Sequence, residues 1–122
     1  MEKTQQEIDQ EAGDKIVAEL EAEQKRLDEI AAKYGVKKVF EITAFNDDDV
    51  PVTAVFKKPT RNILSAALSQ QERDPMGAKE IVLKNCFLEG DKRIYTDDEF
   101  FMSACTKVDD LITFRKAEVK KN

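Results

Sequence analysis

Apolar residues in the first part of the chain recur at a helical period. Between residues 5 and 33 they return every three, four or seven positions, which places them on one stripe of a helix. Gly35 follows this stripe, and a glycine at that point is typical of a helix end. The pattern predicts one long amphipathic helix over residues 5–33. Its stripe consists of Ile8, Ala12, Ile16, Val17, Leu20, Leu27, Ile30, Ala31 and Tyr34.

The pattern changes to that of β-strands after residue 35. Two runs, 36–45 and 50–57, are rich in β-branched and aromatic residues, and the polar segment 46–49 separates them. We therefore expect an antiparallel hairpin. Pro51 has no amide hydrogen to donate, which places the start of the second strand at a sheet edge. The residues expected on one shared face are Phe40, Ile42 and Ala44 of the first strand and Val52, Ala54 and Phe56 of the second.

Three helix starts are signalled in the rest of the chain. Thr60 and Asp74 are residue types that cap a helix, and Pro75 suits a first helical position. The segment 96–99 has the form of a capping box. We expect one helix from Thr60 with Ile63, Leu64, Ala67 and Leu68 on its inner face, a central helix from Asp74 that stops at Gly90, and a last helix from Thr96 that ends near Lys121.

These elements predict an α+β fold that is mostly helical: a long N-terminal helix, a β-hairpin, then three helices. A chain of 122 residues has room for one modest core. We expect residues 1–34 to form an amphipathic helix that either docks or projects as an arm. Residues 35–122 are expected to form a domain of the hairpin and three helices.

Charge narrows the classes of partner. Charged residues make up 37% of the chain, and no apolar run approaches the roughly 20 residues of a membrane span. The net charge of −5 is concentrated in residues 1–34, which hold ten acidic and five basic side chains. Such a field repels phosphate, so we expect no nucleic-acid partner, and the lack of an apolar span predicts no membrane partner. The first residues have no apolar signal region, which favours the cytoplasm.

The residues needed for catalysis are scarce. The chain has no histidine, which excludes Ser-His and Cys-His pairs and the usual zinc ligands. Cys86 and Cys105 lie in apolar patterns and are interpreted as reduced core thiols, with a disulfide in an oxidising compartment as the alternative. We therefore expect no enzymatic activity, no cofactor and no metal.

Three charged clusters each allow a structural and a functional interpretation. The segment 47–49 is a hairpin turn or a hard-cation ligand set, although it lacks the spacing of a calcium loop. The segment 97–99 is a helix cap or a pair of reactive carboxylates. Lys57 and Lys58 with Arg61 form a solvated loop or a site for an acidic partner. We favour the structural interpretation for each.

The remaining candidates for function are apolar side chains. The first helix packs within its own domain, on another copy, or on a client protein. Phe100 and Phe114 lie beside the stripe of the last helix and pose the same choice. The candidate protein-binding residues are Ile16, Leu20, Leu27, Ile30, Phe100 and Phe114.

Several short motifs follow one another between Val55 and Lys121. Each is also an ordinary capping or turn signal. In order they are Phe56-Lys57-Lys58-Pro59-Thr60-Arg61, Arg73-Asp74-Pro75 with Glu80 and Leu83-Lys84-Asn85-Cys86, Leu88-Glu89-Gly90-Asp91, Asp97-Asp98 with Phe100-Phe101, and Leu111-Ile112 before Ala117-Glu118-Val119-Lys120-Lys121.

In this order the motifs resemble the tail assembly chaperones of long-tailed bacteriophages and prophages. The resemblance covers a little over half of the chain, and the long acidic first helix departs from the family's compact pattern. It implies a protein that coats the helical tape-measure protein, helps to recruit the tail tube protein, and leaves before the virion is complete. The alternatives are a non-catalytic oligomeric structural or adaptor protein, and an acidic decoy for a DNA-binding protein.

Overall fold

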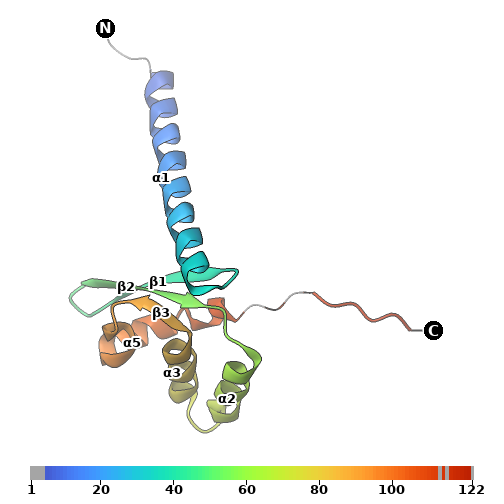
Figure 1. Ribbon diagram of the computed structural model, residues 1–122. Coiled ribbons are helices and arrows are strands. Elements are labelled where there is room, and N and C mark those ends of the chain that lie inside the picture. Colours follow the sequence, from blue (N-terminus) through green and yellow to red (C-terminus); the bar gives the residue numbers. More distant parts are fainter. Residues whose placement is uncertain (1–4, 113, 115, 122) are drawn as a thin grey trace. The chain divides into compact units, whose positions relative to one another are not determined.

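The predicted first helix is confirmed. Helix α1 runs over Gln5–Tyr34 (Figure 1). Gly35 ends it with a φ of 67°, a conformation that favours glycine. The amides of Gly35 and Val36 donate to the carbonyls of Ala32 and Ala31 at 3.2 and 3.0 Å, which satisfies acceptors left over at the helix end.

The computed structural model describes residues 5–112, 114 and 116–121, with side chains from residue 13 onward, so the predicted stripe positions Ile8 and Ala12 lie outside the described side chains. The chain divides into two compact units, residues 1–38 and 39–122. The first unit contains α1. The second contains β1 (Val39–Phe45), β2 (Pro51–Lys57), α2 (Arg61–Gln71), α3 (Pro75–Cys86), β3 (Phe87–Gly90), α4 (Arg93–Thr96), α5 (Asp98–Cys105) and the 3₁₀ turn η1 (Val108–Leu111).

The expected hairpin is confirmed, and so is its shared face. Strands β1 and β2 pair antiparallel, with Ile42 opposite Ala54 and Ala44 opposite Val52. All four side chains are buried. Because strand side chains alternate between faces, this register brings every second residue of both strands onto the helices of the second unit.

The acidic segment between the strands is a turn. The Oδ1 atom of Asn46 accepts hydrogen bonds from the amides of Asp48 and Val50 at 3.0 and 2.9 Å. The amide of Asp47 donates to Oε1 of Glu99 at 2.8 Å, which ties the turn to α5. The aspartates therefore take part in the hairpin connection.

The helix starts predicted at Thr60 and Asp74 are confirmed. The Thr60 hydroxyl accepts from the amide of Ile63 at 3.4 Å, and the Asp74 carboxylate accepts from the amide of Gly77 at 2.9 Å. Both side chains satisfy amides that the first helical turn leaves without a partner.

The predicted end of the central helix at Gly90 is wrong. Helix α3 stops at Cys86, and the next four residues form β3, which pairs antiparallel with β2. The sheet order is thus β1-β2-β3, and β2 is the central strand. Because β3 pairs with β2 only at positions 54–56, Pro51 still has a neighbour on one side alone, as its missing amide hydrogen requires.

The predicted last helix is broken: its first part forms the short helix α5 and the turn η1, and α4 ends where the prediction placed its start. Helix α5 is capped by Asp97, whose carboxylate accepts from the amides of Glu99 and Phe100 at 3.1 and 3.3 Å; Thr96 instead ends α4. The Thr106 hydroxyl donates to the carbonyl of Ser103 at 2.7 Å where α5 ends. The apolar spacing of the segment fits a 3₁₀ turn as well as a helix, and none of the described residues from Ile112 onward is helical.

The core of the second unit lies where the sheet meets α3, α4, α5 and η1 (Figure 1). Helix α5 packs on β1, while α3 and α4 pack on β2. The largest fully buried side chains are Phe56, Leu83, Ile94, Leu111, Val82, Val108 and Cys86.

Candidate functional site

The first apolar surface is on α1. Ile16 and Leu20 are 57% and 60% exposed, and Val17 between them is also more than half exposed. Farther along the same predicted stripe, Leu27 is half-buried and Ile30 is buried. Three large side chains in the described part of the stripe are therefore exposed to a partner. We call these residues, Ile16, Val17 and Leu20, the α1 stripe.

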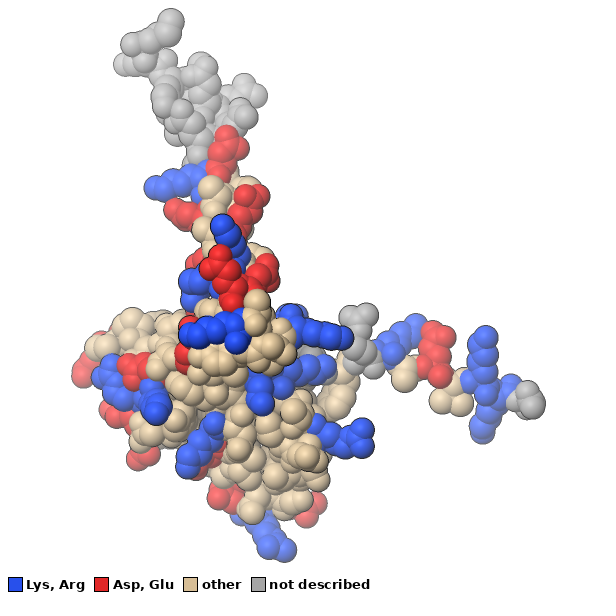
Figure 2. Space-filling model, in the orientation of Figure 1, with Lys and Arg blue, Asp and Glu red and all other residues tan. Residues whose placement is uncertain are grey.

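Charged side chains surround the α1 stripe (Figure 2). Acidic and basic residues both occur along the helix, and Nε2 of Gln24 donates to Oδ1 of Asp28 at 2.8 Å one turn away. Large aliphatics between charges are typical of a helix that associates with another helix.

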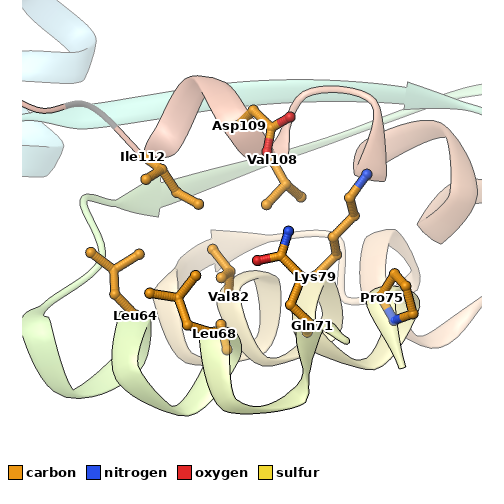
Figure 3. Close-up of a pocket in the computed structure, with 11 residues that line it drawn as sticks. Leu64, Leu68, Gln71, Pro75, Lys79, Val82, Val108, Asp109 and Ile112 are labelled. Carbon is orange, nitrogen blue, oxygen red and sulfur yellow. The ribbon is translucent and has the colours of Figure 1, made fainter. Parts of the chain in front are cut away.

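The second apolar surface is a groove in the second unit between α2, α3 and η1 (Figure 3). Its volume is about 80 Å³, and it is partly open to solvent. Leu64 and Leu68 of α2 lie on one side. Val108 of η1 and Ile112, which directly follows η1, lie on the other, and Val82 of α3 lies between them. We call this the α2–α3 groove.

The groove exists because α2 is only partly covered. The prediction placed Leu68 on the inner face of α2, but the side chain is 65% exposed, whereas Ala67 is buried. Helix α2 packs against α3 and makes no comparable contact with the sheet. One row of its apolar side chains therefore reaches α3, and the next row is left at the rim of the groove.

Polar groups are few in the groove and lie at one end. They are Gln71 of α2, Lys79 of α3 and Asp109 of η1 (Figure 3). The Nζ atom of Lys79 also lies 3.5 Å from the carbonyl oxygen of Cys105. On the face that Figure 2 shows, the surface over α2 is largely uncharged. An apolar channel with polar groups at one end suits an amphipathic segment of another polypeptide.

The two aromatic candidates, Phe100 and Phe114, lie in different environments. Phe100 is 3% exposed, lies in the core, and has the guanidinium of Arg93 5.5 Å from its ring centre. It supports the fold and is not presented to a partner. Phe114 is 82% exposed and follows Ile112, which lines the groove.

Both thiols are buried in the core, and both are free. Burial raises the pKa of the Cys86 thiol to about 11, although the nearby charge of Lys57 acts in the opposite direction. Burial likewise raises the pKa of Cys105, against the effect of Lys79. A protonated, enclosed thiol is a poor nucleophile, so neither cysteine is suited to covalent chemistry.

We expect neither thiol to react with a disulfide reagent at pH 8 in the folded protein, and both to react in urea.

The burial of Cys86 also makes the stability of the protein depend on pH. The ordinary pKa is 9.0, so above pH 9 the unfolded chain releases a proton that folded Cys86 keeps, and stability falls as the pH rises from 9 towards 11. Urea titrations across this range, with Cys86→Ala as the control that lacks this contribution, measure the effect. Rapid labelling of either thiol in the folded protein would contradict the burial of that side chain.

The acidic segments 47–49 and 97–99 lie in the hairpin turn and at the start of α5. Among the residues that the structure describes, no group of three or more histidine, cysteine, aspartate and glutamate side chains is placed to hold a metal ion. The Asp97 carboxylate serves as a helix cap. Over the same described ranges, no helix has both the length and the apolar character needed to cross a membrane.

Sequence reasoning found the α1 stripe but missed the α2–α3 groove. The sequence shows an apolar face on α2, formed by Ile63, Leu64, Ala67 and Leu68, but not how much of that face the neighbouring elements cover. Comparisons with protein-family models, with curated proteins and with solved structures give no match for this chain.

Proposed function

We propose that this protein is a non-catalytic tail assembly chaperone of a long-tailed bacteriophage or prophage. In this proposal it acts in the bacterial host cytoplasm, binds apolar stripes of the helical tape-measure protein, and keeps that protein from aggregating until the tail tube assembles. The tail tube protein is the second proposed partner. No cofactor, metal or nucleic acid takes part.

The α2–α3 groove is the observation that carries the proposal. A chaperone of a helical client needs an apolar surface that is accessible before the client arrives and is stable without it. Leu64 and Leu68 provide one wall, and the buried side chains of Val82 and Val108 connect the groove to the core. The motifs between Val55 and Lys121 that suggest the family include the first residue of α2, both ends of α3, and Leu111 of η1.

The reversible character of the task also fits this surface. A shallow groove buries a few apolar side chains of a client, each worth roughly 1.5–3 kcal/mol when fully enclosed. The cost of association offsets much of that gain. Binding of moderate strength would allow the chaperone to leave when tube subunits replace it.

The test is a pull-down and titration with the tape-measure and tail tube proteins encoded in the same genome. We expect the wild-type chain to bind the tape-measure protein, and Leu68→Asp to weaken binding at least about tenfold because a carboxylate would enter the apolar groove. Ala66→Asp is the matched control, since Ala66 is an exposed residue of α2 outside the groove. It should bind as the wild type does.

Two results would contradict different parts of the proposal, the function itself and the place where the client binds. If neither tail protein binds the wild-type chain, the assigned function is wrong. If both bind and Leu68→Asp has no more effect than Ala66→Asp, the function stands and the groove is not the client site.

The exposed α1 stripe favours a second candidate, a non-catalytic oligomeric structural or adaptor protein. Three large aliphatics exposed on consecutive turns would be covered if copies of the chain associate. A stable oligomer that forms without any client and that Leu20→Asp disperses, as measured by light scattering, would support this candidate.

A further inference from the structure

A heptad seam runs along α1. Ile16, Leu20, Glu23, Leu27, Ile30 and Tyr34 are separated by four, three, four, three and four residues, which is the spacing of the core positions of a two-stranded coiled coil. The exposed side chains Ile16 and Leu20 lie in this seam, and Val17 flanks it. The seam has one charged member, Glu23.

The position of Glu23 decides which orientation of two helices is favourable. In a parallel pair, each seam residue meets its own counterpart, so two Glu23 carboxylates would share one apolar layer. Like charges brought together away from water are strongly unfavourable. In an antiparallel pair, Glu23 instead meets Leu20 of the second copy, and Ile16 meets Leu27. Each copy then contributes one carboxylate to a different layer.

The flanking charges decide the register of an antiparallel pair. Glu19 and Arg26 precede Leu20 and Leu27 on the same edge of the seam, and in an antiparallel pair this edge of one helix faces the same edge of the other. The register that places Ile16 beside Leu27 also places Glu19 beside Arg26 of the second copy, and symmetry repeats this pair. A shift by one heptad brings either Glu19 against Glu19 or Arg26 against Arg26.

We propose that a second copy of this chain covers the α1 stripe, with the two α1 helices antiparallel and Glu19 of each copy paired with Arg26 of the other. Arg26 also has an interaction within its own chain; its guanidinium carries five N–H donors, so it can bond a second carboxylate. In this register Gly13 of one copy falls opposite Ile30 of the other. Ile30 is already buried, so it needs no large partner at that position.

This inference extends the oligomeric candidate by naming the orientation and the register, and it does not depend on any tail protein. The experiment is sedimentation equilibrium of the full chain at low and high salt. We expect a monomer–dimer equilibrium. Glu19→Arg and Arg26→Glu should each weaken the dimer at least about tenfold, because each creates two like-charge contacts.

The combined Glu19→Arg/Arg26→Glu variant should restore the wild-type dissociation constant, because the pairs are re-formed with opposite sign. High salt should reduce these differences. Glu21→Arg and Lys25→Glu are the matched controls, since both residues lie outside the seam and its edges, and they should leave the dimer unchanged. Glu23→Leu should tighten the dimer at least about tenfold. In the proposed register Glu23 of each copy meets Leu20 of the other, so the substitution makes two layers of the seam fully apolar.

Two results would overturn the proposal. A chain that stays monomeric at hundreds of micromolar, with Glu23→Leu monomeric too, removes both the seam and the oligomeric candidate. A dimer whose charge variants show no rescue when combined removes the antiparallel register and leaves the oligomeric candidate in place. Circular dichroism of each variant verifies that α1 and the second unit remain folded.

Discussion

Phe56→Ala is expected to lower the free energy of unfolding of the second unit by about 3–5 kcal/mol, the usual cost of removing a buried aromatic ring. Phe56 is 0% exposed and lies on the central strand of the sheet. Its ring centre is 5.9 Å from that of Phe87, with the planes at 82°, so it packs edge-to-face against the first residue of β3. Removal would leave a cavity and loosen the third strand.

Urea denaturation followed by circular dichroism measures this loss. Phe114→Ala is the matched control, because the same ring is removed at a position that is 82% exposed, and it should change stability by less than about 0.5 kcal/mol. A loss of this size is a large part of the 5–15 kcal/mol of an ordinary domain, so the Phe56→Ala protein should unfold at a much lower urea concentration than the wild type. Equal effects of the two substitutions would show that β2 is not the centre of the packed core.

Gly90→Ala is expected to destabilise the second unit by about 3 kcal/mol or more, since strained backbone alone costs roughly 1–3 kcal/mol at one residue. Gly90 has a φ of 126° at the end of β3. A methyl group there would come within 2.5 Å of the Cα of Ala54 and 2.6 Å of the carbonyl oxygen of Thr53. Both atoms belong to the backbone of β2, which cannot move without disturbing its pairing with β1.

Gly13→Ala is the control for this substitution. Nothing lies within 4 Å of a methyl group added at Gly13, and the residue is inside α1. The change should therefore stabilise the helix by about 0.5–1 kcal/mol. Thermal unfolding of both variants gives the comparison. A Gly90→Ala protein as stable as the wild type would mean that β3 does not approach β2 as closely as the structure has it.

The exposed groove and the exposed α1 stripe have a common consequence for solubility. Both leave large aliphatic side chains in water, and a net charge of −5 helps to keep such a chain dispersed. The two surfaces are proposed for different partners, the groove for a helical client and the stripe for a second copy. The variants at Leu68 and Leu20 therefore separate their roles.

The candidate site was only half visible in the sequence. The α1 stripe could be predicted because a helical period alone shows which residues share a face. The groove could not, because the pattern of α2 shows an apolar face but not how much of it the neighbours cover. Phe100 shows the reverse: its place beside the predicted stripe left burial and partner binding both open, and the packing of α5 on β1 buries it.

The sequence by itself determined the local structure wherever a signal acts over a few residues. The period of α1, the stop at Gly35, the hairpin faces and the caps Thr60 and Asp74 all depend on neighbours in the chain, and all are as predicted.

Only the tertiary structure decided what depends on distant residues. Four residues after Cys86 became a strand because β2 had an open edge and Phe87 could pack on Phe56. The last apolar segment became α5 and η1 because Val108 and Leu111 are drawn into the core after the chain turns at Thr106. Burial against partners far along the chain outweighs local helix preference, and no local pattern records those partners.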